Sequence, residues 1–259
     1  MNRLSLFLLF VLMLTASCTS RPVLIITGGL RKHALKDKTL AVGGFTAQDL
    51  MTYPGQTEEA VILSDAGTAL QRRFKRSRVL TAEAAWAAAG EPPKKVSRHV
   101  PLIIGRRLTP DFIRKTRASG IDYLLWIELL DNTVESSSGQ WKSTRTESSS
   151  CNCSKKNGAK CSRSSCGSSC GGSCCHTSRE VTEYHSSATS TRKLKASYSL
   201  LDTVSGKPVW RADATLADSN VSGKTSESSF PAVPATPLPP MESLLMRRMT
   251  AAAMTELPK

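Results

Sequence analysis

The chain has 259 residues and a formal net charge of +14 at pH 7, from 35 Lys and Arg against 21 Asp and Glu. Its hydrophobic content of 40% is enough to build a core, which argues against a wholly disordered chain. The long apolar run is confined to the N-terminus, which excludes a multi-pass membrane protein.

The N-terminus has the composition of an export signal. Met1-Asn2-Arg3 is basic, and the apolar run Leu4–Leu14 is shorter than the ~20 residues that a spanning helix requires. The next residues, Leu14-Thr15-Ala16-Ser17-Cys18, resemble the lipobox of bacterial lipoproteins, in which the cysteine is lipidated and becomes the new N-terminus after cleavage. Thr15 departs from that pattern, which usually has Leu, Val or Ile at this place.

The lipobox resemblance implies that Cys18 is the site of lipid attachment, with acyl chains such as palmitate. Thr19, where an Asp would signal retention, resembles the Gram-negative default of sorting to the outer membrane. We therefore expect an outer-membrane lipoprotein that faces the periplasm. The alternatives are inner-membrane anchoring or secretion, and an ordinary signal peptide would leave Cys18 unmodified.

The first half of the mature chain alternates strand and helix patterns. Val23–Ile26 predicts a short strand or part of the tether, and Leu40–Phe45 predicts a buried strand. Ser64 and Asp65 predict the start of a helix, because Ser is a good N-cap and Asp suits the first turn. Arg78–Leu80 then predicts another strand.

Two further helices have clear boundary residues. Thr81 opens an alanine-rich helix that Gly90 and two prolines end. Val100–Ile104 predicts a short strand or a lead-in, and Thr109 with Pro110 predicts a capped helix that Gly120 closes.

The most apolar strand follows. Ile121–Leu130 is hydrophobic on both faces, which indicates a central strand that is covered on both sides. Lys193–Leu201 and Val209–Leu216 alternate apolar and polar residues, which predicts a hairpin with one buried face. A last helix is predicted for Met241–Leu257. The fold class is therefore α/β, with a mixed sheet flanked by helices.

The composition predicts seven segments. They are a signal peptide (1–17), a lipid-anchored tether (18–38), the first part of the α/β domain (39–135), a Ser/Cys-rich hairpin arm (136–191), the hairpin that completes the domain (192–217), a Pro/Ser-rich linker (218–240) and a C-terminal helix (241–259).

The predicted arm is unusually polar, since 18 of the 55 residues from Ser136 to Ser190 are serine. Its flanks, Thr133–Glu135 and Glu180–Tyr184, have β character, which predicts a long antiparallel ribbon. A two-stranded ribbon that is polar on both faces has nothing to bury. We therefore expect its stability to come from a partner or from cross-links.

The tip of the arm carries seven cysteines and a histidine that are candidates for disulfides or for metal binding. They are Cys151, Cys153, Cys161, Cys166, Cys170, Cys174, Cys175 and His176. Disulfides suit an exported protein, and an odd number leaves one thiol to pair between molecules. Thiolates could instead hold Zn or Cu, although the spacing is not that of a zinc ribbon. A flexible tip in which the cysteines matter little is the third alternative.

We find no catalytic motif in the sequence. The four histidines are scattered, no G-x-S-x-G, H-E-x-x-H or P-loop is present, and Asp202 lies in a segment typical of a turn. The sequence therefore predicts a protein that is not an enzyme.

The positive charge is concentrated, because residues 70–120 hold thirteen Lys and Arg against three Asp and Glu. The predicted basic surface consists of Arg72, Arg73, Lys75, Arg76, Arg78, Arg106, Arg107, Arg114, Lys115 and Arg117. Such a surface attracts polyanions. For an exported protein we expect anionic lipid, lipopolysaccharide or an acidic envelope protein rather than nucleic acid. A solvated face with no partner is the alternative.

Two motifs support a resemblance. Gly120-Ile121-Asp122-Tyr123-Leu124-Leu125 and Leu200–Trp210 are similar to strand and hairpin motifs in envelope lipoproteins with the fold of the TolB N-terminal domain and of curli-secretion subunits. The resemblance covers about half of the mature chain. It implies a non-enzymatic scaffold or assembly factor at the outer membrane, with self-association or an envelope partner. The alternative hypothesis is a metal-binding or thiol-redox lipoprotein that acts through the Cys-rich arm.

Overall fold

The computed structural model describes residues 20–31, 33–47, 56–91, 94–97, 100–102, 108–148 and 178–258. The predicted signal peptide, Cys18, the cysteines of the arm with His176, and Arg106 with Arg107 lie outside the described residues.

The described chain contains eight strands and four helices. The strands are β1 (Val23–Thr27), β2 (Thr39–Ala47), β3 (Arg78–Leu80), β4 (Lys94–Ser97), β5 (Val100–Leu102), β6 (Tyr123–Ser148), β7 (Ser178–Asp202) and β8 (Pro208–Ser226). The helices are α2 (Gln56–Arg73), α3 (Ala82–Ala88), α4 (Pro110–Ala118) and α5 (Glu242–Glu256). None of these helices is both long and apolar enough to cross a membrane.

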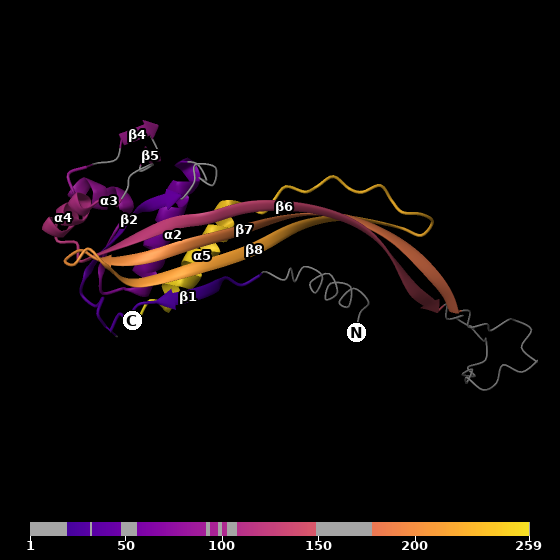
Figure 1. Ribbon diagram of the computed structural model, residues 1–259, viewed down its shortest axis with the longest axis horizontal. Helices are drawn as coiled ribbons and strands as arrows, with labels where there is room; N and C mark the ends of the chain where they lie inside the picture. Colours follow the sequence, from indigo (N-terminus) through magenta and orange to yellow (C-terminus); the bar gives the residue numbers. More distant parts are fainter. Residues whose placement is uncertain are drawn as a thin grey trace, which may run out of the picture. The chain divides into compact units, whose positions relative to one another are not determined.

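Six strands form one mixed sheet in the order β1-β8-β7-β6-β2-β3 (Figure 1). β2 pairs in parallel with both β3 and β6, whereas β1 pairs antiparallel with β8. β4 and β5 form a separate antiparallel pair. The predicted α/β class with a mixed sheet is confirmed.

The pairing of β7 with β8 is antiparallel along its whole length. Thr191 contacts Ser219, the Ser222 hydroxyl donates to the Ala188 carbonyl, and His185 contacts Thr225. Each step of three residues back along β7 is thus a step of three residues forward along β8. This constant register is that of a long hairpin, which is closed by a turn after Asp202.

The middle of the sheet is apolar on both faces. Leu124, Leu125, Trp126 and Ile127 are consecutive and all buried, which confirms the predicted central strand. Gly43 of β2 allows close packing, because a Cβ atom there would lie 2.7 Å from the Leu124 side chain. β2 contacts both α2 and α3, and α2 also packs against α5.

Local boundary signals in the sequence located two helices correctly. The hydroxyls of Thr81 and Thr109 accept hydrogen bonds from the backbone N–H groups of Ala84 and Phe112 at the starts of α3 and α4. Gly120 follows α4 with a φ of 78°, a left-handed conformation that glycine adopts without strain.

The predicted start of the helix near Ser64 is wrong. α2 begins at Gln56, so Ser64 and Asp65 lie in its interior. Its first turn carries Glu58 and Glu59, which complement the positive end of the helix dipole as the predicted Asp65 was expected to do. Ser64 is exposed and Asp65 forms an ion pair with Arg247 of α5. Ser64 has the residue type of an N-cap, but the helix has already begun eight residues before it.

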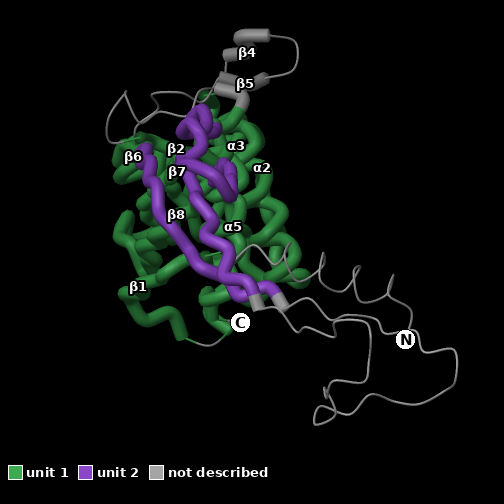
Figure 2. Tube along the Cα trace, turned by 90° about the vertical axis from the view of Figure 1, so that its right-hand side faces the viewer, with its two compact units in different colours: residues 1–135, 190–220, 238–259 green, residues 136–189, 221–237 purple. Residues whose placement is uncertain are grey.

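The chain forms two compact units (Figure 2). Unit 1 comprises residues up to 135, 190–220 and 238–259, and unit 2 comprises 136–189 and 221–237. The apolar core described above belongs to unit 1. β6, β7 and β8 each contribute residues to both units.

Unit 2 contains the predicted hairpin arm, formed by β6 and β7, but the arm is not two-stranded along its whole length. β8 continues ten residues beyond Leu216, the end of the predicted strand, and supplies a third strand. The segment that follows it also takes part, since its Pro231, Ala232 and Ala235 carbonyls accept hydrogen bonds from Gln140, Ser186 and Ser222. One residue from each of β6, β7 and β8 therefore donates a hydrogen bond to this segment.

Candidate functional site: a cationic pocket

One wall of the candidate site is a tight turn between β1 and β2. Residues 33–37 form consecutive backbone hydrogen bonds, including Lys36 N to the His33 carbonyl at 3.1 Å. His33 and Asp37 both have left-handed backbones, with φ values of 66° and 57°. His and Asp tolerate this conformation better than most side chains. The turn holds Leu35 almost completely buried, while Lys36 remains exposed.

The other wall is the end of α2 and the loop that leads to β3. Ser77 donates its hydroxyl to the Leu35 carbonyl at 2.7 Å, and the Arg78 N–H donates to the Lys38 carbonyl at 3.2 Å. These two bonds fasten the loop to the turn. Phe74 is buried between the cations that flank it in the sequence.

The two walls enclose an open pocket of about 470 Å³. Its lining residues are His33, Lys36, Arg72, Arg73, Phe74, Lys75, Arg76 and Ser77. The lining holds five Lys or Arg side chains and no carboxylate.

Most of these cations are not neutralised. In the described part of the chain, Lys36, Arg72, Lys75 and Arg76 form no ion pair. Arg73 is different, because its guanidinium donates two hydrogen bonds, of 3.2 and 2.7 Å, to the Leu257 carbonyl after α5. Arg73 therefore fixes the end of α5, and the other four cations are available to an anion.

The residues of the predicted basic surface do not all lie together in the structure. Arg72, Arg73, Lys75 and Arg76 meet in the pocket, and Arg78 is exposed just after them. His33 and Lys36 were missed, because they lie about forty residues away in the sequence and reach the pocket only through the fold. They belong to a second basic run, Arg31–Lys38, and nothing local in the sequence shows that this run meets the end of α2.

The basic residues of α4 are largely paired. Arg114 and Lys115 both bind Asp111, and Lys115 also binds Glu91 at 2.8 Å. These hydrogen bonds to Glu91 and Asp111 raise the pKa of Lys115. Arg117 is exposed. The α4 cations thus offer an anion less than those of the pocket.

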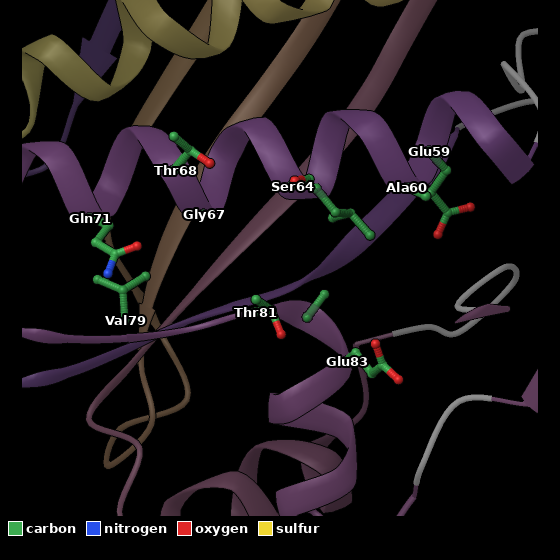
Figure 3. A pocket seen from close by; sticks show the side chains of 11 residues that line it. Glu59, Ala60, Ser64, Gly67, Thr68, Gln71, Val79, Thr81 and Glu83 are labelled. Atoms are coloured by element: carbon green, nitrogen blue, oxygen red, sulfur yellow. The ribbon is translucent and has the colours of Figure 1, made fainter. Parts of the chain in front are cut away.

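A second pocket, of opposite chemical character, lies beside α2 (Figure 3). It measures about 310 Å³ and is formed by α2, β3 and the start of α3. Glu59 and Glu83 border it, together with Thr68, Gln71 and Thr81. This pocket carries carboxylates and no cation, so it would repel the anions that the first pocket attracts.

Asp202 is a turn residue, as predicted. Its carboxylate accepts hydrogen bonds from the Val204 and Ser205 N–H groups and from the Ser205 hydroxyl. Burial raises the pKa of Asp202, but these hydrogen bonds outweigh it and the pKa is lowered. Both carboxylate oxygens therefore accept hydrogen bonds within the β7–β8 turn.

His185 in unit 2 has neighbours that the sequence did not reveal. Its Nε2 lies 2.6 Å from the Ser143 hydroxyl and 3.8 Å from Glu183, and its Nδ1 lies 3.2 Å from the Thr225 hydroxyl. The ring stacks on Trp141 with centroids 5.1 Å apart. Serine and carboxylate face the same nitrogen, so the carboxylate does not orient the ring for a serine nucleophile as in a catalytic triad.

The predictions for the cysteine-rich tip stay predictions, because its residues lie outside the described part of the chain. Within the described part, no three His, Cys, Asp or Glu side chains are grouped so that they could hold a metal ion.

No protein-family model and no curated protein matches the sequence. Among solved structures, the chain is similar to the PelC dodecamer from Paraburkholderia phytofirmans, with 11% identity, a TM-score of 0.39, and coverage of 92% of this chain and 99% of that chain. A dodecamer of a PelC variant from the same organism gives 13% identity, a TM-score of 0.38, and coverage of 92% and 98%. TM-scores below 0.5 do not establish a shared fold.

Proposed function

We propose that the protein is a non-enzymatic envelope lipoprotein, tethered through Cys18 and facing the periplasm, that binds an anionic partner in the cationic pocket. The observation that carries the proposal is the group of four cations, Lys36, Arg72, Lys75 and Arg76, which converge on one pocket without a carboxylate. Like charges held together are stabilised by an anion, so the pocket is suited to bind one.

The chemistry of the pocket favours phosphate groups. A guanidinium presents a fork of N–H donors that matches two oxygens of one phosphate, and lysine adds a point charge. An exported protein meets phosphate on anionic lipid headgroups and on lipopolysaccharide rather than on nucleic acid. We therefore propose a phosphate-bearing envelope lipid as the partner.

The polar clusters elsewhere support binding rather than catalysis. Asp202 is occupied by its turn, and His185 has its carboxylate and serine neighbours at one nitrogen. A scaffold or assembly role is consistent with both arrangements.

The proposal is tested with the mature lipidated protein in a neutral detergent. Binding is measured on surfaces that carry immobilised lipopolysaccharide, phosphatidylglycerol or polyglutamate, at increasing NaCl. We expect Arg72→Gln with Arg76→Gln to weaken binding to a phosphate surface by about tenfold, which corresponds to about 1.4 kcal/mol. The lipopolysaccharide and phosphatidylglycerol surfaces distinguish the two sources of phosphate.

The matched control is Arg114→Gln with Arg117→Gln, which removes the same net charge from α4. It should leave binding within about twofold. Equal losses in the two double variants would show a general charge effect and contradict the pocket. Stronger binding to polyglutamate than to either phosphate surface would identify an acidic protein as the partner instead.

A further inference from the structure

β1 exposes an unusual amount of apolar side chain for an edge strand. Val23, Ile25 and Ile26 are 65%, 64% and 42% exposed. Among the strands that the structure describes, β1 pairs with β8 alone, so it forms one edge of the sheet. Exposed apolar side chains that adjoin one another on a surface mark an interaction site more often than singly scattered ones do.

Two of these side chains stand on the same face of the sheet. Val23 pairs with Thr215 and Ile25 pairs with Asp213, and residues two apart in a strand point to the same side. Arg21 precedes the strand and Arg31 follows it, and both are exposed. The strand therefore presents two apolar side chains in a segment that is bordered by cations.

The residue just before this segment is fixed to the body of unit 1. The Ser20 hydroxyl donates to the carbonyl of Ala217, and the Ser20 carbonyl accepts a hydrogen bond from Arg248 of α5. Arg248 is itself held by Asp218 at 2.8 Å. Ser20 is thus attached to both β8 and α5.

This attachment leaves a very short tether. Cys18 precedes Ser20 by two residues, which span at most about 7 Å when fully extended. An acylated Cys18 lies at the membrane interface, so the edge of unit 1 that carries Ser20 is held against that interface. This step rests on the lipid attachment in the proposed function.

We infer that β1 is a membrane-docking surface, in which Val23 and Ile25 enter the interfacial region of the bilayer and Arg21 meets anionic headgroups. The short tether brings the strand to the lipid, the apolar side chains gain by leaving water, and the cation is attracted to the surface. The cationic pocket is a separate site, since it shares no residue with β1.

A second copy of the chain fits these observations less well. Adding a strand at the edge of β1 would satisfy its backbone N–H and C=O groups. It would leave Val23 and Ile25 exposed, because their side chains stand perpendicular to the sheet. A bilayer covers the side chains directly.

The test uses the lipidated protein in vesicles of phosphatidylcholine and phosphatidylglycerol that contain a phosphatidylcholine with a photoactivatable diazirine in its acyl chain. After irradiation, lipid adducts are mapped by mass spectrometry. We expect adducts on Val23–Ile26, and we expect Val23→Ser with Ile25→Ser to reduce them at least fivefold.

The control variant is Val204→Ser. Val204 is 63% exposed, like Val23, but it lies in the β7–β8 turn, past the Thr27 end of β1 and not at the end that follows Ser20. It should change the adducts on β1 by less than twofold. Thermal melting of the variants checks that their fold is retained.

The inference and the proposed function fail in different ways. Intact mass shows whether Cys18 carries acyl chains, and a protein without them would contradict the proposed tether. An acylated protein without adducts on Val23–Ile26 would overturn the docking surface alone. A chemically cross-linked dimer through β1 with no lipid adduct would replace the bilayer by a second copy.

Discussion

Unit 1 and unit 2 share three long strands but are stabilised by different interactions. Unit 1 buries large side chains on these strands, such as Tyr198 of β7 and Trp210 of β8. Among the described residues of unit 2, the buried side chains are Val181, Ser186 and Ala188. The same strands therefore pass from an apolar core to a polar environment.

Polar and aromatic pairs take the place of a core in unit 2. Trp141 stacks on His185, and Tyr184 meets Phe230 edge to face with centroids 5.0 Å apart. Lys142 lies over both Tyr184 and Phe230, at 5.2 and 5.6 Å from the ring centroids. Each such pair contributes on the order of 1 kcal/mol, so we expect unit 2 to open at a lower free energy than unit 1.

Trp210→Ala should have the largest effect, because it removes a large side chain from the apolar core that distinguishes unit 1. Trp210 is almost completely buried, and truncation of a buried Trp costs about 3–5 kcal/mol. Chemical denaturation measures the loss, and hydrogen exchange of α2 and α5 should rise together. Unchanged exchange in α5 would contradict a single core in unit 1.

The next effect is a pH dependence of unit 1. Glu242 at the start of α5 is buried, where Asn132 donates to its Oε2 at 2.6 Å and Arg192 lies 3.3 Å away. Burial raises the pKa of Glu242 to about 7, the Glu58 carboxylate adds to this, and Arg192 and Asn132 partly oppose it.

A carboxyl whose pKa is higher in the folded than in the unfolded protein stabilises the fold below its unfolded pKa and loses this contribution as the pH rises through its folded pKa. For Glu242 the free energy of unfolding should therefore fall by up to about 3 kcal/mol between pH 4.5 and pH 8. Glu242→Gln keeps a neutral side chain at all pH values and should flatten this part of the curve. An equal slope in the two proteins would contradict the assignment.

The sequence was informative where local rules decide the structure. Alternation along Lys193–Leu201 and Val209–Leu216, the run of apolar residues around Leu125, and the cap at Thr109 each predicted an element that the structure contains. These signals depend on residues within one or two turns of each other.

Contacts between distant segments could not be predicted in this way. The continuation of β8 to Ser226 is polar, and it is a strand because β7 lies beside it. His33 and Lys36 join Arg72 only because the turn after β1 meets the end of α2. The basic run was visible in the sequence, but pairing with Asp111 and Glu91 removes Arg114 and Lys115 from the available charge.

Trp141→Ala tests the aromatic part of unit 2. Trp141 is 50% exposed, so its loss leaves no cavity, and the stacking on His185 is worth about 1 kcal/mol. We expect faster hydrogen exchange in residues 136–147 and 179–189, with the exchange of α5 unchanged. A loss of global stability as large as that of Trp210→Ala would show that the two units unfold as one.

Arg145→Ala should have the smallest effect, and its salt dependence identifies the cause. The Arg145 guanidinium lies 3.0 Å from Glu183 of β7 and 3.4 Å from Glu227 after β8, and it also binds Glu147 of its own strand. Its side chain is 52% exposed, so water screens these ion pairs and their loss should cost less than about 1 kcal/mol. Hydrogen exchange of unit 2 at 50 mM and at 1 M NaCl measures this, and the difference between Arg145→Ala and the original protein should disappear at 1 M.

Arg145→Lys keeps the charge without the guanidinium fork and should restore part of the protection at 50 mM. If the difference persists at 1 M NaCl, the arginine stabilises unit 2 through the packing of its aliphatic chain rather than through its charge.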